Sequence, residues 1–367
     1  MYNIDTILKL CLEREPITHE MAYALYDKAP LSELAAAADE LRRKVVPDAQ
    51  VVTWQIDRNV NITNVCISGC KFCNFHCKPF QKELHYITTL EEYRTKIERT
   101  IELGGDQLLL QGGMHPKLGI TFYENLFRSL KEMFPQIKLH ALGAPEVSHI
   151  ARISGLSSLD TLKRLVDAGL ESLPGAGAEI LVPQVRRKIS PAKPSTEEWI
   201  KVMHEAHTLN LPTSATMMYG HIEEPHHRVD HLLTIRDLQA RVPQGNYGFI
   251  AFIPWIFHSS GTRLEAEGIV TDFSPAEYLR IIAISRLLLN NIDNIQASWL
   301  TVGKATAQMA LHSGANDFGS IMIEENVVSS AGANNSFDAN GIQEAIRAAG
   351  FTPQLRNQLY QYREYAQ

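Results

Sequence analysis

Short hydrophobic runs alternate with segments of helical spacing along most of the chain. Most runs are followed by a polar or glycine-rich turn and then by apolar positions that recur every three or four residues, which is the pattern of a strand followed by an amphipathic helix. The eight runs predicted as strands are Val52–Ile56 continuing into Asn61–Ile62, Gln107–Gln111, Lys138–Leu142, Glu171–Leu173, Thr213–Tyr219, Phe249–Pro254, Asn294–Ser298 and Asn316–Phe318. Because strands separated by helices pair in parallel, eight such units predict a closed (β/α)8 barrel of the TIM type, with an open barrel of six units as the alternative.

The predicted helices have recognisable ends. Ser195 and Glu198 form a capping-box pattern, and Ser274 precedes Pro275 at the first helical position of another segment. Gly104 ends a third helical run, as glycine commonly does. These signals place the helices between the strands, as a barrel requires.

Three regions are predicted along the chain. Residues 1–50 form an N-terminal helical extension, residues 51–323 form the barrel, and residues 324–367 form a C-terminal cap with a helix near Ile342–Ala349. Neither extension is large enough to fold alone.

The composition is that of an ordinary globular chain, because 45% of the 367 residues are hydrophobic and 21% are charged. The formal net charge of −6 leaves no basic excess to neutralise phosphates, so no nucleic-acid partner is expected. No run approaches the roughly 20 apolar residues that cross a bilayer, and the N-terminus carries scattered charges without a hydrophobic leader. We therefore expect a cytoplasmic protein without a membrane partner.

Four of the five cysteines lie between positions 66 and 77. Cys66, Cys70 and Cys73 form a C-x3-C-x2-C motif, and thiolates are soft ligands that suit iron–sulfur clusters and zinc. A structural zinc site needs a fourth ligand, for which Cys77 and His76 are the nearest candidates. The motif directly follows the first predicted strand, at the end of a barrel that carries active sites. Spacing and location therefore favour a catalytic cluster, in which three thiolates leave one of four iron atoms open.

With Phe72 as the aromatic residue before the last cysteine, this motif resembles the signature of the radical S-adenosylmethionine superfamily. Segments 61–66 (NITNVC), 111–116 (QGGMHP), 174–180 (PGAGAEI) and 315–320 (ANDFGS) resemble the branch that acts on futalosine derivatives and deazaflavin precursors. Segments 294–299 (NIQASW) and 323–328 (IEENVV) are most similar to the cyclic dehypoxanthinyl futalosine synthase family of menaquinone biosynthesis. The resemblance covers most of the chain.

The resemblance implies two cofactors. Cys66, Cys70 and Cys73 would hold a 4Fe–4S cluster, whose open iron chelates S-adenosylmethionine and whose electron releases a 5′-deoxyadenosyl radical. The protein would then supply positioning and exclude water. Cys77 does not match a ligand position.

The resemblance also implies a binding site for S-adenosylmethionine at the strand ends. Phe72 would pack near the adenine, and the turn Gln111-Gly112-Gly113 would meet the methionine amino group through backbone carbonyls. Glycine suits such a turn because no side chain obstructs the approach of the backbone. The acidic residue that often follows these glycines in the family is Met114 here, so only backbone contacts are expected.

Further cofactor positions come from the fourth and fifth strands. Glu179 corresponds to a position that hydrogen-bonds the ribose hydroxyls, and the segment from Met217 to Gly220 corresponds to backbone that reads the adenine edge. Arg186 or Arg187 could pair with the methionine carboxylate, and the sequence does not decide between them.

The implied reaction needs a base, since ring closure removes a proton from an arene carbon. His115, His149, His221 and Glu146 follow the second, third and fifth strands, where their side chains could point into the mouth of the barrel. A histidine with a pKa near neutral, or a carboxyl with a raised pKa, would serve. The alternative for each is a hydrogen-bonding role that supports the site.

The small-molecule substrate of this family carries a benzoate and a sugar. A buried benzoate needs a cation or several N–H donors, for which Arg58 and Arg263 are candidates. Phe257, Tyr219 and Trp299 could flank an aromatic ring.

The function that the resemblance implies is an oxidoreductase that forms a C–C bond by radical cyclisation of dehypoxanthine futalosine, with flavodoxin or ferredoxin as low-potential electron donor. One alternative is an addition enzyme such as aminofutalosine synthase, which would incorporate the adenosyl group into its product. A second alternative is a deazaflavin-precursor synthase, which differs in its substrates. The third is a non-catalytic iron–sulfur or zinc protein, which would not cleave S-adenosylmethionine.

Overall fold

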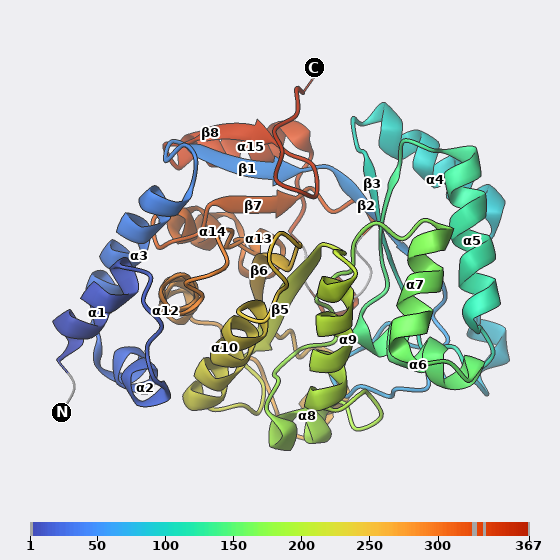
Figure 1. Ribbon diagram of the computed structural model, residues 1–367, viewed down its shortest axis with the longest axis horizontal. Coiled ribbons are helices and arrows are strands. Elements are labelled where there is room, and N and C mark those ends of the chain that lie inside the picture. The colour runs from blue at the N-terminus through green and yellow to red at the C-terminus, as the bar shows by residue number, and fades with distance from the viewer. Residues whose placement is uncertain (1–2, 325–328, 333–334, 366–367) are drawn as a thin grey trace.

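The structure, a computed structural model, describes residues 3–324, 329–332 and 335–365. Parallel strands form its centre, and helices lie outside them (Figure 1). The strands are β1 (Val51–Gln55), β2 (Asp57–Asn61), β3 (Gln107–Gln111), β4 (Lys138–Ala141), β5 (Thr213–Tyr219), β6 (Phe249–Ile256), β7 (Asp317–Ser320) and β8 (Thr352–Leu355).

Parallel pairing closes these strands into a barrel. β2, β3 and β4 form one sheet, β5 and β6 a second, and β7, β1 and β8 a third. The sheets are joined by single parallel bridges, which are His140–Ser172, Leu173–Thr213, Phe252–Ile295, Gln296–Asp317 and Arg58–Ile323. The ring closes because β1 continues through Ile56 into β2. The (β/α)8 barrel predicted from the sequence is confirmed.

Three of the predicted strands differ in detail from the structure. The first is two strands, β1 and β2, interrupted at Ile56. Segments 171–173 and 294–298 contribute only bridges. The first of these is followed at once by Pro174, which has no N–H to extend a ladder. In segment 294–298, the side chain of Asn316 takes the place of a neighbouring strand's backbone. Its Oδ1 accepts from the Ile295 N–H at 2.9 Å, and its Nδ2 donates to Asn294 Oδ1 at 2.9 Å.

The helices begin where the sequence signals predict them. Ser195 and Glu198 form a reciprocal capping box, and the Ser274 hydroxyl accepts from the N–H of Glu277. The α-helices are α1 (Ile4–Leu12), α2 (His19–Lys28), α3 (Leu31–Val45), α4 (Leu90–Glu102), α5 (Ile120–Met133), α6 (Ala144–Ser154), α7 (Ser158–Ala168), α8 (Pro183–Ile189), α9 (Thr196–Thr208), α10 (Pro225–Gln239), α11 (Arg263–Ala266), α12 (Pro275–Leu288), α13 (Trp299–Val302), α14 (Lys304–Leu311) and α15 (Ala339–Ala348). Two 3-10 turns are Lys82–Leu84 and Ser329–Ala331.

The regions before and after the barrel pack on its outside. α1, α2 and α3 lie beside α12 (Figure 1), and α15 matches the helix predicted near Ile342–Ala349. The C-terminal region also supplies β8, which the sequence analysis missed and which pairs with β1 from Val51–Thr352 to Trp54–Leu355. The division of the chain at residues 50 and 323 stays a prediction, and residues 325–328 of the segment quoted above lie outside the described residues.

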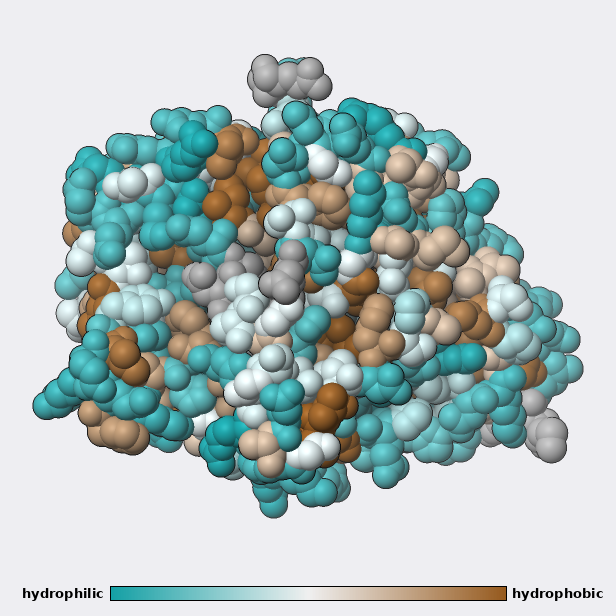
Figure 2. Space-filling model, turned by 180° about the vertical axis from the view of Figure 1, so that it is seen from behind, coloured by the Kyte–Doolittle hydropathy of each residue, from teal (hydrophilic) through white to brown (hydrophobic). Residues whose placement is uncertain are grey.

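The outer surface is mostly hydrophilic on the face shown in Figure 2, where hydrophobic residues form separate patches. No helix among the described residues has the length and apolar character needed to cross a membrane. The hydrophobic residues gather instead in the core between the barrel and its helices.

Candidate active site

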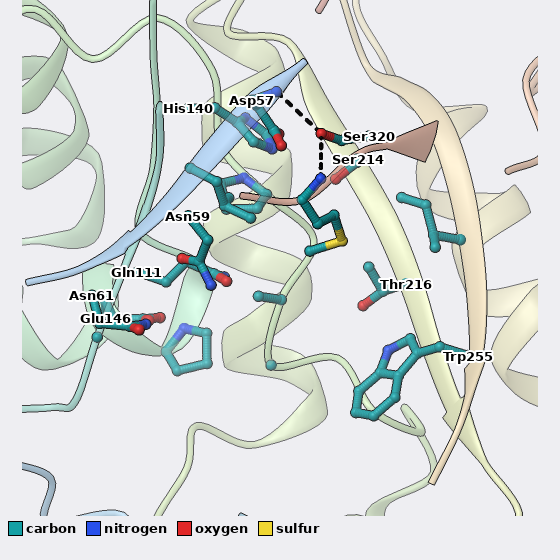
Figure 3. A pocket seen from close by; sticks show the side chains of 18 of the residues that line it. Asp57, Asn59, Asn61, Gln111, His140, Glu146, Ser214, Thr216, Trp255 and Ser320 are labelled. Carbon is teal, nitrogen blue, oxygen red and sulfur yellow. Dashed lines mark hydrogen bonds between the residues drawn. The ribbon is translucent and has the colours of Figure 1, made fainter. Parts of the chain in front are cut away.

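A cavity of about 370 Å³ lies inside the barrel, and the cysteine motif forms part of its wall. Alternate strand residues line it, because successive side chains of a strand point to opposite faces. Barrel interiors are usually filled by branched apolar side chains. Here Asp57, Asn59, Ser214 and Thr216 face the space instead (Figure 3), so a cavity whose wall is otherwise largely apolar also carries polar groups that could bind a ligand.

The three cysteines of the motif all line this cavity. The Ser68 hydroxyl lies 2.9 Å from Cys66 Sγ and 3.4 Å from Cys70 Sγ, and the backbone N–H of Met114 donates to Cys66 Sγ at 3.3 Å. Burial raises the pKa of the Cys70 thiol to about 11 and also raises the pKa of Cys73. A thiolate at these positions therefore needs a compensating positive charge, which a metal centre provides.

The spacing of these thiols fits an iron–sulfur cluster. Among the residues that the structure describes, no three His, Cys, Asp or Glu side chains converge as ligands of one metal ion do. The C-x3-C-x2-C spacing along the chain is therefore the observation that points to an iron–sulfur cluster. Cys77 does not line the cavity, and its Sγ lies 3.6 Å from the Lys78 carbonyl oxygen and 3.5 Å from the Gln81 carbonyl oxygen.

The glycine turn after β3 lies directly against the cysteine loop. Gln111, Gly112 and Gly113 line the cavity. A Cβ atom on Gly113 would come within 2.2 Å of the Val65 carbonyl oxygen, so no other residue fits there without moving the loop. The Gly113 N–H donates to the Thr63 carbonyl oxygen at 2.8 Å, which fixes this approach.

Glu179 lies in the cavity wall in a strained conformation. Its backbone φ is +43°, in the left-handed region that costs a non-glycine residue free energy and that clusters at functional sites. Its Oε1 accepts from Lys193 Nζ at 2.6 Å, and its Oε2 lies 3.6 Å from Arg186 Nη1 without a hydrogen-bond partner among the described residues. That buried oxygen is free to accept a hydrogen bond from a ligand.

Lys193 is a cavity cation that the sequence analysis missed. Burial alone would lower the pKa of Lys193, but the anionic forms of Cys70 and Glu179 raise it, so the ammonium group stays charged. Its Nζ lies 5.3 Å from the centre of the Phe72 ring, which also lines the cavity. Arg186, one of the two arginines considered from sequence, donates instead to the carbonyl oxygens of Gly177, Ala178 and Pro194, and Arg187 is exposed.

Of the four proposed bases, Glu146 lines the cavity. Its carboxyl is close to the backbone of Gly112 in the glycine turn, and burial raises its pKa. The three histidines do not line the cavity. His149 Nε2 bonds to the carbonyl oxygen of His115 at 2.8 Å, and His221 lies beside Glu223, with its Nδ1 3.0 Å from Oε2.

Several other residues singled out from sequence also lie outside the cavity wall. Arg58 donates to Thr100 and pairs with Glu324 at 3.0 Å, because its strand position points it toward α4. Alternation along β5 likewise buries Met217 in the core. The remaining positions that the structure does not bring to the wall are Arg263, Gly220, Phe257, Tyr219 and Trp299.

Polar residues deep in the barrel are the main part of the site that sequence reasoning missed. Asp57 and Asn59 alternate along β2, and His140 lies on β4 (Figure 3). Burial lowers the pKa of His140 to about 3, so it is neutral. The Asp-x-Asn-x-Asn pattern of residues 57–61 carried the signal, because a strand with one polar face inside a barrel must line a cavity.

Comparison with family models matches two regions of the chain. Residues 60–235 match the radical SAM superfamily, and residues 246–367 match the CofH/MqnC C-terminal region. The second match includes α15 and β8, so the C-terminal region is also a family feature.

Curated relatives extend over nearly the whole chain. The cyclic dehypoxanthine futalosine synthase of Streptomyces coelicolor is 44% identical, over 94% of this chain and 85% of the relative. The enzyme of the same name from Halalkalibacterium halodurans is 40% identical, over 98% of this chain and 95% of the relative. The 5-amino-6-(D-ribitylamino)uracil–L-tyrosine 4-hydroxyphenyl transferase of Archaeoglobus fulgidus is 40% identical, over 88% and 91%.

Solved structures support the fold. Methylornithine synthase (PylB) superposes with a TM-score of 0.72 at 18% identity, covering 95% of this chain and 97% of PylB. The [FeFe]-hydrogenase maturase HydG from Carboxydothermus hydrogenoformans has a TM-score of 0.73 at 16% identity, covering 97% and 80%. The cofactors of the radical SAM superfamily, a 4Fe–4S cluster and S-adenosylmethionine, are those of this chain. The cavity, its cysteine motif and these relatives together establish that the chain belongs to the radical SAM superfamily, in the group that includes the cyclic dehypoxanthine futalosine synthases.

Proposed function

We propose that this enzyme cyclises dehypoxanthine futalosine to cyclic dehypoxanthine futalosine, a step of menaquinone biosynthesis. The observation that carries the proposal is the 44% and 40% identity to two proteins of that name over nearly the full chain. The cavity beside the cysteine motif carries polar side chains within a largely apolar wall, which suits a small substrate that has both an aryl ring and hydroxyl groups.

The residues around the cavity mouth fit the cofactors. Cys66, Cys70 and Cys73 would hold the cluster, and the turn at Gln111, Gly112 and Gly113 would meet the amino group of S-adenosylmethionine. When bound, these cofactors supply a 5′-deoxyadenosyl radical that takes a hydrogen atom from the ribose C4′ of the substrate. The chain's own contribution is to fix the reacting atoms in place and to exclude water.

Glu179 and Lys193 complete the proposed cofactor site. The free Oε2 of Glu179 would accept from the ribose hydroxyls, and Lys193 would pair with the methionine carboxylate. Phe72 would contact the adenine from beneath Lys193. The backbone from Met217 to Gly220 stays a proposed contact of the adenine edge.

Glu146 is the proposed proton acceptor. After the ribose carbon radical adds to the aryl ring, one electron passes to a one-electron acceptor and one proton leaves the ring carbon, which restores aromaticity. Among the proposed bases, Glu146 is the one that lines the cavity, whose wall also contains the three cysteines of the motif. Because burial raises the pKa of its carboxyl, its anion is a stronger base than an exposed glutamate.

We expect Glu146→Gln to separate hydrogen abstraction from product formation. Abstraction precedes proton loss, so the variant should still release 5′-deoxyadenosine but yield at least about a hundredfold less cyclised product, in keeping with the usual contribution of a positioned base. Liquid chromatography with mass detection measures both compounds in one assay. His149→Gln is the matched control, because His149 lies outside the cavity wall and should keep both yields. Equal losses in the two variants would contradict the assignment.

The pH dependence should follow the same group. The base must be ionised, and the pKa of Glu146 is raised, so product per 5′-deoxyadenosine should rise as the pH passes upward through that pKa and fall below it. Glu146→Gln should abolish this rise, which the same assay run across a pH series would measure.

Transfer chemistry on a ribitylaminouracil is the second candidate. Six transferase relatives are 37–40% identical to this chain, nearly as similar as the second synthase. The two functions differ in substrates, so anaerobically reconstituted enzyme with a low-potential donor such as flavodoxin or ferredoxin should be offered each set separately. Consumption of dehypoxanthine futalosine supports the cyclase, and consumption of 5-amino-6-(D-ribitylamino)uracil with tyrosine supports the transferase.

A further inference from the structure

The end of the cavity farthest from the cysteine motif is built from one layer of polar side chains. Asp57 begins β2, whose other end leads to the cysteines. Strand register places Gln107 opposite Asp57 and Gln55 opposite Ser320, and the Ser320 hydroxyl accepts from the Asp57 N–H at 3.1 Å. These four residues therefore surround the same depth of the barrel (Asp57 and Ser320 in Figure 3), and Asn59 faces the cavity next to them, two residues farther along β2.

Polar atoms of this layer lack partners although they are buried. Gln55 Nε2, Gln107 Oε1 and Asn59 Oδ1 have no hydrogen-bond partner among the described residues, and the three side chains are only 1–3% exposed. Asp57 accepts a long hydrogen bond from Gln107 Nε2 at 3.4 Å and lies beside the Ser320 hydroxyl. Buried polar atoms are nearly always paired, so unpaired ones on side chains that line a cavity point to a polar ligand beside them.

The charges at this end argue against an anion. Arg356 is the cation that lines it, and its guanidinium already bonds both oxygens of Asp317, at 2.6 and 3.0 Å, and Gln55 Oε1 at 2.8 Å. A carboxylate placed here would meet the oxygens of Asp57, Asn59 and Gln107 without a free cation.

The pattern of free atoms matches hydroxyl groups. A hydroxyl can donate one hydrogen bond and accept another. It could therefore donate to the amide oxygen of Gln107 or Asn59 and accept from Nε2 of Gln55. Burial raises the pKa of Asp57, and a neutral carboxyl can likewise both donate and accept. An aromatic ring would leave all of these atoms unpaired.

We infer that Gln55, Asp57 and Gln107 of this layer, together with Asn59, bind the hydroxyl-bearing sugar of the substrate, and that the substrate carboxylate lies elsewhere. This rests on the proposed function, in which the sugar also carries the reacting C4′. With its hydroxyls directed at this layer, the sugar turns C4′, which bears no hydroxyl, toward the cysteine end. The aryl group then lies beside the apolar wall of Leu109, Ile253 and Trp255.

Equilibrium binding to the reconstituted enzyme, loaded with S-adenosylmethionine but without reductant, tests this inference. The probes are dehypoxanthine futalosine and its 2-deoxyribosyl analogue, measured by calorimetry. The parent should bind the analogue about tenfold more weakly, the usual effect of one unmade hydrogen bond in a buried site. Gln107→Leu and Asn59→Leu should each weaken binding of the full substrate by about tenfold. The variant that has lost the partner of the 2-hydroxyl should bind dehypoxanthine futalosine and its 2-deoxyribosyl analogue equally, because the analogue then has no hydrogen bond left to lose.

Exposed Gln136→Leu is the matched control for the Gln→Leu change and should keep the parent's affinities and their ratio. Asn59→Leu nearly conserves side-chain volume, so one variant stays informative if Gln107→Leu fails to fold. If both folded variants keep the parent's affinity and ratio, the inference is overturned, even where cyclised product still forms and the proposed function stands.

Binding measurements also test the polar layer if the proposed function itself fails. If the parent does not cyclise dehypoxanthine futalosine, the proposed function fails, and 5-amino-6-(D-ribitylamino)uracil becomes the second probe because its ribityl chain carries hydroxyls. About tenfold weaker binding of that probe in Gln107→Leu or Asn59→Leu supports the hydroxyl-binding layer, and unchanged binding in both overturns it.

Discussion

Replacing any one of Cys66, Cys70 or Cys73 by alanine should abolish cleavage of S-adenosylmethionine and remove most of the brown iron–sulfur absorbance. All three thiols line the same cavity, and burial disfavours the thiolate of Cys70 unless a metal centre compensates it. An alanine removes a ligand that no neighbouring thiol can replace, because Cys77 lies outside the cavity wall. Absorbance after anaerobic reconstitution and the yield of 5′-deoxyadenosine measure the two losses.

Cys77→Ala is the matched control, since it removes a buried thiol from the same loop without touching the cavity. Its absorbance and cleavage should equal those of the parent. A Cys77→Ala protein without a cluster, together with a Cys73→Ala protein that keeps one, would show that the proposed ligand set is incorrect.

Asp317→Asn should destabilise the fold by about 3–5 kcal/mol, the usual cost of breaking a buried ion pair. Asp317 is fully buried, and its two oxygens bond Arg356 while Oδ2 also accepts from the Thr53 hydroxyl at 2.5 Å. The amide would leave the buried guanidinium of Arg356 without its counter-charge. Chemical denaturation monitored by circular dichroism measures the change in the free energy of unfolding.

The exposed Asp167→Asn on α7 is the control and should stay within about 0.5 kcal/mol of the parent. The double variant Asp317→Asn/Arg356→Leu should recover part of the loss, because it removes the stranded charge. If Asp317→Asn is as stable as the parent, Arg356 is held by its other contacts. The ion pair of Asp317 with Arg356 would then not anchor the C-terminal region to the barrel.

The features that the sequence predicted well have local signals. The cysteine spacing and the glycine turn each lie within a few residues, and the structure brings both to one cavity. The barrel followed from repeated strand–helix alternation, which survives even where segments 171–173 and 294–298 are reduced to bridges. β8 was missed because Pro353 and its short length hide the strand pattern, and its pairing with β1 is a contact between distant parts of the chain.

The features that were not predicted depend on side-chain direction and on long-range contacts. Glu146 and His149 both lie on α6, but His149 bonds the carbonyl oxygen of His115, and His221 lies against Glu223, so neither histidine lines the cavity. Lys193 reaches the cavity from the segment after α8, through its ion pair with Glu179. A position after a strand therefore restricts the candidates for a base but does not select among them.

The mass of the product formed from dehypoxanthine futalosine tests the central proposal most directly. Reconstituted enzyme, reductant and S-adenosylmethionine should give one 5′-deoxyadenosine per product, and a product lighter than the substrate by two hydrogen atoms, one taken by the radical and one lost as a proton with an electron. A product heavier by the adenosyl group, without release of 5′-deoxyadenosine, would contradict the cyclase and establish an addition enzyme in its place.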